Sequence, residues 1–382
     1  MYGISGYYAI DLRFNNQIIN ASSATSRGIF IMQNVQALLP SCRIQFGDPS
    51  GQALSNQILM DGTAIALTMG KGLEDSKVAT PSNFIMKGMP DPARPGVGQP
   101  DMVIRGILKG ATKYLAQLDK AYSGPSSDVI SQIAELCGLT PDVDATNDSM
   151  TWLPQRSSRG LFAKLVAQHG WIDDSSCMSL VVREDGTLRY KNVTTIIKGK
   201  PVATFYDIVK PSSGTAHQIL DHRVISKAAV FNSLASYGTT SITVGQDGST
   251  TKYDSVSATR LSNNLSMSPT VKTDSKSVGS RYVPSDLGNC HDQYIKAEHQ
   301  NIRLRSLFSF DVEILTDEET SLGLLDLVQI DIRDSATLDT NDAVSGNYIV
   351  TGKTRTISGN RYMEKFLLSS QGPNVSKLQA GV

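Results

Sequence analysis

Short runs in which apolar and polar residues alternate dominate the first third of the chain. Apolar side chains occupy nearly every second position from Tyr8 to Phe14, a period of two that is typical of a half-buried strand. The two asparagines that follow favour a tight turn. Similar runs, most of them bounded by glycine, proline, asparagine or aspartate, recur at 42–46, 64–67, 83–86 and 102–108. This succession of short strands predicts an antiparallel barrel or sandwich.

One stretch of this region does not follow the strand pattern. Residues 90–100 contain four prolines and two glycines, so we expect a long irregular loop there.

The pattern changes to a helical period near Ser123. Ser126 or Ser127 can cap a helix, and Gly138 stands where a helix would end. A second helix is predicted from about Ser158 to Gly170. The apolar residues of the first helix are Val129, Ile130, Ile133, Leu136 and Cys137, and those expected on one face of the second are Leu161, Phe162, Leu165 and Val166.

The pair Asp185-Gly186 lies between two strand-like runs and is a strong signal for a β-hairpin. Residues 116–200 are therefore predicted to form a small α/β module inserted into a β protein. The stretch 239–285 is rich in Ser, Thr, Gly, Asn and Asp, and we expect polar strands with long exposed loops or partial disorder there.

The last part of the chain returns to the strand pattern. A weakly periodic helix is expected from 290 to 300, followed by strands at 307–314 and 328–332. The turn Ser358-Gly359-Asn360 predicts a final hairpin between 348–357 and 361–368. Residues 371–382 are polar, and an extended tail is expected.

Two segments far apart in the sequence are similar to one another. The run 83–88, Asn-Phe-Ile-Met-Lys-Gly, resembles the run 347–352, Asn-Tyr-Ile-Val-Thr-Gly, and each follows a period-two strand, at 64–69 and 327–332. Coincidence between two ordinary strand starts is one interpretation. The other is a duplicated structural unit, of which internal similarity is the sequence mark. The second predicts that Phe84 and Tyr348 occupy equivalent strands.

Composition narrows the range of functions. The 382 residues include 36 Lys plus Arg and 36 Asp plus Glu, so the net charge is zero, and no basic stripe favours stable binding to nucleic acid. No apolar run approaches the length of a membrane span, and the N-terminal residues do not have the pattern of a signal peptide. Cys42, Cys137, Cys177 and Cys290 are widely scattered, as expected for reduced and mostly buried thiols of a protein made in the cytosol.

The sequence offers no set of reactive groups that would form a catalytic site. The five histidines, His169, His217, His222, His291 and His299, form no HExxH motif, and the nucleophile-elbow and phosphate-binding glycine motifs are absent. The acidic pairs Asp173-Asp174 and Glu318-Glu319 are expected in a turn and a loop, whereas glycosidase carboxylates must flank a cleft. No catalytic, cofactor-binding or metal-binding residue is therefore predicted, and no cofactor is expected.

The order of motifs in residues 112–192 resembles that of a known family. Two helices and a hairpin, at 127–139, 158–171 and 182–188, follow one another and are linked through Asp148 and Trp152. This order, between two barrel-like regions, is similar to the baseplate hub proteins of contractile phage tails and to the hub part of type VI secretion spikes. The resemblance covers most of the chain and rests on order, because each motif is weak alone.

The resemblance implies a mainly β fold with two related tube-type antiparallel β-barrels and a two-helix α/β module. The corresponding domains are 1–115, 116–200 and 201–370, with 371–382 as a tail. It also implies a homotrimeric ring that joins a sixfold tail tube, or a tube-initiator protein, to a central spike and lines a channel for DNA. The tape measure protein and baseplate wedge proteins are further candidate partners, and the virion is the expected location.

Two departures from the family pattern qualify this expectation. The chain carries no appended spike or lysozyme-like domain, so the spike would be a separate protein, and 239–285 is long for a simple barrel loop. Two other classes of protein stay open on the residues alone. A tail-associated cell-wall hydrolase would need paired carboxylates or a metal in a cleft, and a carbohydrate-binding β-sandwich would need exposed aromatic residues clustered on one sheet face.

Overall fold

The structure is a computed structural model. It describes residues 8–15, 17–18, 28–47, 59–71, 82–93, 101–154, 156–173, 176–226, 239–244, 250–254, 279–284, 304, 310–341, 344–359 and 361–370. The predicted helix at 290–300 and the predicted tail at 371–382 lie outside these residues.

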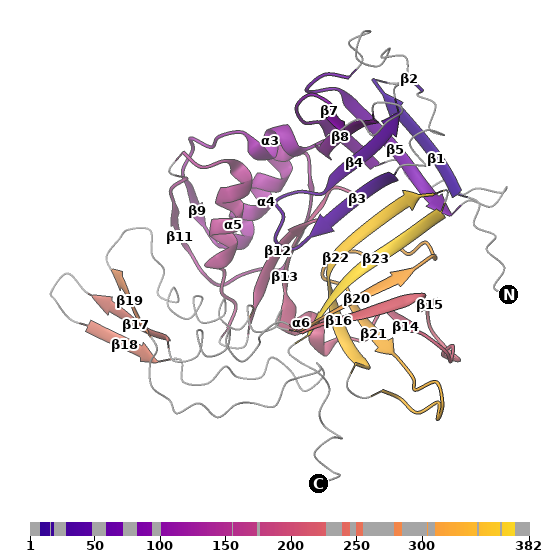
Figure 1. The fold of residues 1–382 in the computed structure, drawn as a ribbon. Helices are drawn as coiled ribbons and strands as arrows, with labels where there is room; N and C mark the ends of the chain where they lie inside the picture. Colours follow the sequence, from indigo (N-terminus) through magenta and orange to yellow (C-terminus); the bar gives the residue numbers. More distant parts are fainter. Residues whose placement is uncertain are drawn as a thin grey trace.

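Most strands of the described part of the chain belong to one curled sheet of fifteen strands (Figure 1). We call strands β1 to β8 the first half-sheet, and strands β14 to β16 with β20 to β23 the second half-sheet. The first contains β1 (Tyr8–Phe14), β2 (Gln17–Ile18), β3 (Gly28–Asn34), β4 (Ser41–Gly47), β5 (Ala64–Lys71), β6 (Ser82–Met86), β7 (Asp91–Ala93) and β8 (Asp101–Leu108). The second contains β14 (Ala203–Tyr206), β15 (Ala216–Gln218), β16 (Asp221–Ser226), β20 (Phe310–Thr316), β21 (Leu327–Asp331), β22 (Gly346–Ser358) and β23 (Arg361–Ser370).

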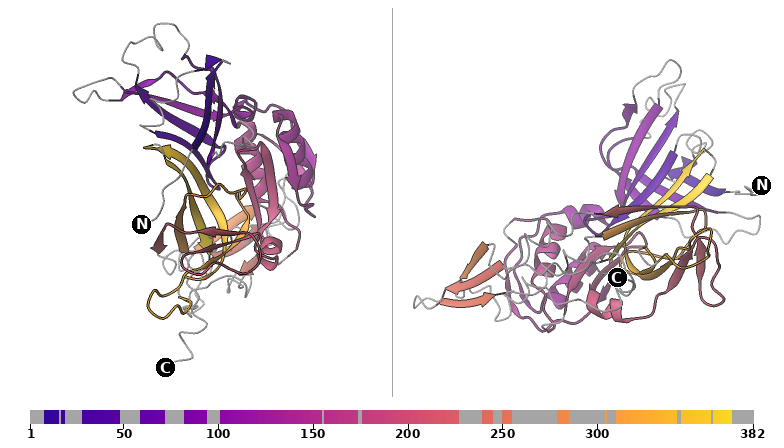
Figure 2. Two further views of the ribbon diagram at one scale, coloured as in Figure 1. Left: turned by 90° about the vertical axis from the view of Figure 1, so that its right-hand side faces the viewer. Right: turned by 60° about the horizontal axis from the view of Figure 1, so that its bottom comes forward.

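Between the half-sheets the chain forms an α/β segment, which packs beside the sheet (Figures 1 and 2). Its elements are α3 (Ala111–Leu115), β9 (Tyr122–Gly124), α4 (Ser126–Cys137), β10 (Thr140–Val143), β11 (Met150–Trp152), α5 (Arg159–Gln168), β12 (Met178–Val182), β13 (Thr187–Asn192) and α6 (Val193–Lys198). The stretch 239–285 contributes a separate three-stranded sheet of β17 (Thr239–Val244), β18 (Thr250–Asp254) and β19 (Gly279–Pro284).

The two half-sheets repeat one strand order. Along the sheet the first runs β1-β5-β6-β8-β4-β3, and the second runs β14-β21-β22-β23-β20-β16. Along the chain both series are also in the same order, so β3 corresponds to β16, β4 to β20, β5 to β21, β6 to β22 and β8 to β23.

The register of these strands agrees with the second of the two interpretations of the sequence similarity, that of a duplicated unit. Phe84 pairs with Ile65 in the first half-sheet, and Tyr348 pairs with Val328 in the second. Phe84 and Tyr348 are both fully buried. The two segments therefore occupy equivalent strands.

Two details of the sheet differ from the expectation of two separate antiparallel barrels. The half-sheets are continuous with one another, because β3 pairs with β22. Strand β14 runs parallel to both β15 and β21, so this edge of the second half-sheet is not antiparallel.

Three local predictions need correction. Ser126 and Ser127 lie inside the first turn of α4, and the N-cap position is Pro125. On α5 the predicted face is only half right, because Phe162 and Val166 are buried whereas Leu161 and Leu165 are about half exposed. Within the expected loop at 90–100, the short strand β7 pairs with β8, since proline is tolerated in an edge strand.

Other local predictions are confirmed. Gly138 ends α4 in the left-handed conformation, with a φ of 72°, which a residue without a Cβ adopts at little cost. The Asp185-Gly186 turn joins β12 to β13 as a hairpin, and the final hairpin pairs β22 with β23 from Ser358 and Arg361 inwards.

Candidate functional site: a charged junction beneath the two half-sheets

The turn between β12 and β13 meets both half-sheets at one place. A cavity of about 780 Å³ lies there, and Glu184, Arg183 and the loop 319–323 line it together with residues of β6, β8 and β22. A cavity into which several polar or charged side chains converge is the usual first candidate for a functional site. The decisive question is whether those charges are available to a ligand or already bound to one another.

Glu184 binds three parts of the chain at once. Its carboxylate accepts hydrogen bonds from Gln33 at 3.1 Å and from Ser82, both in the first half-sheet, and forms an ion pair with Arg355 of β22. The amide oxygen of Gln33 in turn accepts the backbone N–H of Glu184 at 3.2 Å. The guanidinium of Arg355 also donates to Met69 O at 3.0 Å. Glu184 therefore ties the α/β segment to both half-sheets.

A second buried pair lies next to this one. Lys353 Nζ is 3.1 Å from Glu364 Oε2, and the two side chains are 5% and 0% exposed. Lys353 also donates to the carbonyl oxygens of Thr320 and Leu322, both at 3.0 Å. Burial lowers the pKa of Lys353 from its ordinary value, because an ammonium group loses hydration there.

The Glu364 carboxylate also has other partners. It accepts from Thr320 at 2.7 Å and from Tyr362 at 2.5 Å. Both charges of the buried pair are thus bound within the protein.

Two arginines of the hairpin hold the loop that precedes β21. Arg183 and Arg189 donate to Leu324 O, and both reach Asp326 Oδ1, at 2.5 and 3.0 Å. On β13, Arg189 and Lys191 face Asp142 of the neighbouring parallel strand β10, with distances of 3.0 and 2.6 Å. These contacts extend the junction along the hairpin.

A buried carboxylate fixes the start of α4. Asp148, 1% exposed, accepts the backbone N–H and the hydroxyl of Ser126 at 2.9 and 2.8 Å. It also accepts the backbone N–H of Trp171 at 3.1 Å. A carboxylate at the N-terminus of a helix satisfies amide groups that have no partner inside the helix and interacts favourably with the helix dipole. Asp148 therefore has a structural use.

The histidines do not come together in the part of the chain that the structure describes. His169 is buried beside Trp152, His217 binds Glu318 at 2.9 Å, and His222 is exposed on β16. His291 and His299 lie outside the described residues. Within those residues, no group of three His, Cys, Asp or Glu side chains could hold a metal ion.

The described thiols are not disposed to react. Cys42, Cys137 and Cys177 are buried and form no disulfide. Burial raises the pKa of Cys42 to about 12 and raises that of Cys137, so the nucleophilic thiolate is disfavoured at both. Cys290 lies outside the described residues.

Three residues of the two acidic pairs, Glu318, Glu319 and Asp173, are among the described residues. Glu318 accepts from His217 and from the backbone of Gln218, while Glu319 lines the cavity. The carbonyl oxygen of Asp173 accepts the backbone N–H of Ser176 at 3.1 Å, and Asp174 is outside the described residues. The sequence did not single out the residues that form the junction, because their partners lie far away along the chain.

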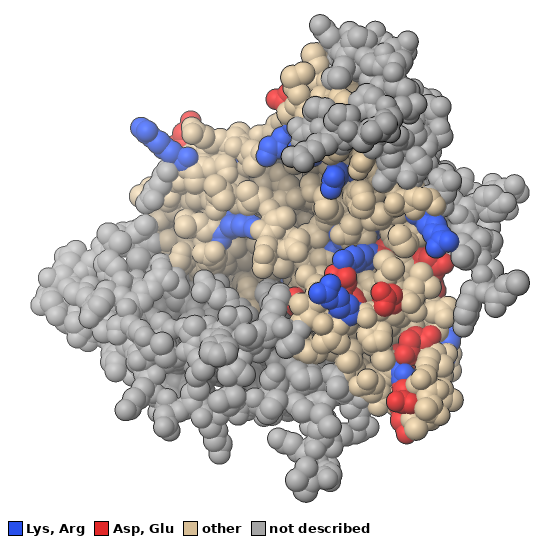
Figure 3. Space-filling view, viewed as in Figure 1, with Lys and Arg blue, Asp and Glu red and all other residues tan. Residues whose placement is uncertain are grey.

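On the face seen in Figure 3, the described residues show no concentration of positive charge. Lys and Arg side chains are scattered there, and the acidic side chains gather mostly over the second half-sheet. Among the helices of the described residues, none has the length and hydrophobicity that a membrane span requires.

The fold is similar to that of phage tail proteins over almost its whole length. A tail protein from Neisseria meningitidis MC58 matches with a TM-score of 0.60 at 12% identity, covering 96% of this chain and 98% of that one. A 43 kDa tail protein of a prophage from Shewanella oneidensis matches with a TM-score of 0.57 at 10% identity, covering 95% and 98%. A prophage tail protein from Listeria monocytogenes matches with a TM-score of 0.50 at 10% identity, covering 97% of both chains.

No protein-family model and no curated protein sequence matches this chain. The similarity to the tail proteins is therefore one of fold, and the expected resemblance to tail proteins is confirmed at that level.

Proposed function

We propose that this chain is a structural hub protein of a phage-type tail, and that three copies form a ring of six half-sheets. The observation that carries the proposal is the repeat of one strand order in the two half-sheets. Each copy with two equivalent units gives a threefold ring an approximate sixfold face, which matches the symmetry of a tail tube. The domains at 1–115, 116–200 and 201–370 would then be a tube-type barrel, an α/β module and a second tube-type barrel.

The charged junction supports a scaffolding role. Glu184, Arg355, Lys353 and Glu364 bind one another and so leave few polar groups for a substrate. What they do is hold the α/β segment and the two half-sheets in one arrangement. A connector that transmits load between tube and spike needs this rigidity, whereas an enzyme needs a reactive group that can be approached.

Partners and location follow from this role. One face of the ring would meet a sixfold tail tube or its initiator, and the other a separate spike protein. The channel would pass DNA without holding it, which suits a chain of zero net charge. The protein would act in the virion.

The test is the solution mass of the purified chain, by light scattering over a range of concentrations, followed by electron microscopy of the main species. A stable species of three 41.2 kDa chains with a central opening is expected. A stable dimer, or a trimer without a central opening, would contradict the proposal. Addition of tube and spike proteins from the same source should then give a ternary complex, bound on opposite faces.

A further inference from the structure

The two half-sheets of one chain are joined edge to edge. Strand β22 is 13 residues long, and one of its edges pairs along its length with β23. Its other edge pairs first with β21, through Gly346 to Ile349, and then with β3, through Gly352 to Ile357. We call the pairing of β3 with β22 the joint (Figure 1).

The repeat identifies the strands that correspond to the two sides of the joint. Ile31 of β3 pairs with Cys42, and Val224 of β16 pairs with Val312, in strands β4 and β20 that correspond to one another. On the other side, β7 takes the place of the second part of β22. Pro92 pairs with Met102 of β8, as Arg355 pairs with Glu364 of β23.

Within the part of the chain that the structure describes, neither of the corresponding edges has a second neighbouring strand. Among the described residues, β16 pairs with β20 alone, and β7 pairs with β8 alone. Ile31 is fully buried, whereas its counterpart Val224 is 42% exposed, although Val312 beside it is fully buried. Val224 lies at the same position of its strand as Ile31, but no described strand covers it as β22 covers Ile31. Unpaired N–H and C=O groups make such an edge a template for another strand.

We propose that β16 of one copy pairs antiparallel with β7 of a second copy, so that the joint within the chain is repeated between chains. The register follows from the joint. Val224 lies opposite Pro92 of the second copy, as Ile31 lies opposite Arg355, and Arg223 lies opposite Ala93, as Phe30 lies opposite Thr356. Pro92 has no N–H, so this ladder has one donor fewer than the joint.

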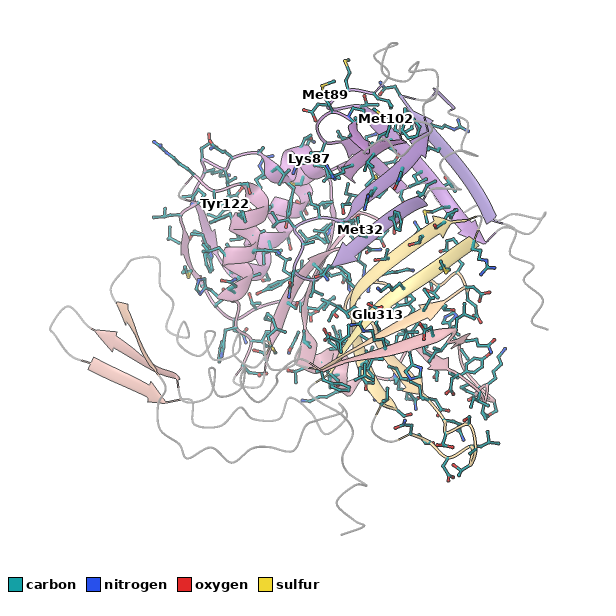
Figure 4. The ribbon with its side chains drawn as sticks, viewed as in Figure 1. Met32, Lys87, Met89, Met102, Tyr122 and Glu313 are labelled. Carbon is teal, nitrogen blue, oxygen red and sulfur yellow. The ribbon has the colours of Figure 1, made fainter. Side chains whose placement is uncertain are left out.

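The occupant is a second copy because each chain offers both halves of the contact. An interface between two different surfaces of the same chain is head-to-tail, and such contacts close into a ring when the rotation allows. Three chains then contain six joints, three within chains and three between them. This inference rests on the proposed ring and adds the surface that closes it. Figure 4 labels Met32, on β3 of the first half-sheet, and Glu313, on β20 of the second half-sheet.

Paired cysteines test the register directly. The double variant A93C/R223C, oxidised gently and run on a denaturing gel without reductant, should give a covalent trimer, since opposite residues of an antiparallel pair are close enough for a disulfide. Each single variant should stay monomeric on the same gel. A93C/D221C is the matched register control, because its cysteines are two positions out of step, and its yield of trimer should be at least several-fold lower.

The outcomes distinguish a failure of the strand pairing from a failure of the proposed ring. A trimer by light scattering that gives no cross-link in A93C/R223C overturns the strand pairing and leaves the ring standing. A chain that stays monomeric at every concentration and gives no cross-link overturns both. Covalent species that grow beyond three chains support the pairing but contradict a closed threefold ring.

A single substitution gives a second readout. Val224→Lys places a charge on the exposed edge of β16, and the solution mass should fall from three chains to one while the circular dichroism spectrum stays unchanged. Leu338→Lys, at an exposed leucine between β21 and β22, is the control and should remain trimeric. A Val224→Lys variant that is still trimeric would overturn the inference.

Discussion

The outer strands of the two half-sheets, β3 and β16, correspond to one another but differ in their surroundings. In the first half-sheet the outer strand β3 is covered by β22, and Ile29 and Ile31 are fully buried. In the second half-sheet no described strand covers the outer strand β16, and the corresponding side chains of His222 and Val224 are exposed. The strand order is the same in both half-sheets, so the difference in burial comes from β22, which pairs with β3 and not with β16. It shows that an edge can be complete in one copy of a repeat and incomplete in the other.

The covered end also carries the buried charges. Arg355 lies opposite Ile31 in the joint, and its partner Glu184 comes from the α/β segment. At the open end, within the described residues, β16 instead presents Asp221, His222 and Arg223 to solvent. Charged side chains on an edge limit unwanted pairing, so only a partner of matching shape should bind there. Four predictions test this comparison.

The largest effect is expected from Arg355→Met, which breaks the covered end. The substitution leaves the carboxylate of Glu184 buried without its counter-charge, and loss of one partner of a buried ion pair costs about 3–5 kcal/mol of unfolding free energy. Urea unfolding at pH 7 measures it. The control is Lys365→Met, which removes the more exposed pair between Lys365 and Glu313 and should cost about 0–1 kcal/mol. Equal losses in both variants would contradict the distinction.

Truncation of corresponding residues gives the most direct comparison. Ile31→Ala should destabilise the chain by about 2–5 kcal/mol, because it opens a cavity in a closed core. Val224→Ala, at the same position of the repeat, should cost about 0.5 kcal/mol when measured on the monomer, since its side chain is half exposed. If the two substitutions cost the same in the monomer, β16 is not an open edge in solution.

A smaller effect is expected where the α/β segment is held at a helix start. Asp148→Asn keeps the shape but loses the charge and one acceptor, and a lost helix cap costs about 0.5–2 kcal/mol. Thermal unfolding should show the loss, and hydrogen exchange should show faster exchange of the first-turn amides of α4. Unchanged protection of the Ser126 amide would contradict the role of Asp148 as a cap.

The smallest effect is a dependence on pH in the hairpin that ties this segment to the sheet. Burial opposes the charge of Asp142, but the hydrogen bonds and charges of Lys191 and Arg189 outweigh it and lower the pKa of this carboxyl. A lowered pKa contributes stability above the unfolded value, about 3.9, and that stability is lost as the pH falls through the folded value.

Asp142→Asn should therefore be less stable than the parent at pH 7 by about 0.2–1 kcal/mol, because the carboxylate is partly exposed. The difference should be smaller at about pH 2, below the unfolded pKa, because the parent carboxyl there takes up a proton and loses its charge. Urea unfolding of both proteins at the two pH values measures it. A difference of the same size in acid would mean that the asparagine disturbs packing instead.

Much of the local structure was predictable because its signals are local. The period of two marked β1, β4 and β5, and Gly138 and the Asp185-Gly186 turn marked the ends of elements. The similarity of 83–88 to 347–352 was enough to predict equivalent strands, since a repeated fold keeps side chains of the same kind at the same register. The face of α5 was partly wrong, because periodicity alone does not say which side of a helix the sheet covers.

The sequence by itself thus determined many of the elements and their order, and it offered the repeat as one of two interpretations. Only the tertiary structure decided which edges meet. Arg355 and Glu184 are separated by 171 residues, and nothing near either of them in the chain indicates the other. The same holds for the joint. Strands β3 and β22 pair through backbone groups that every residue other than proline carries, so no side-chain pattern predicts this pairing. Which edge is covered depends on the length of β22 and on where the chain returns in space, and these are properties of the folded molecule.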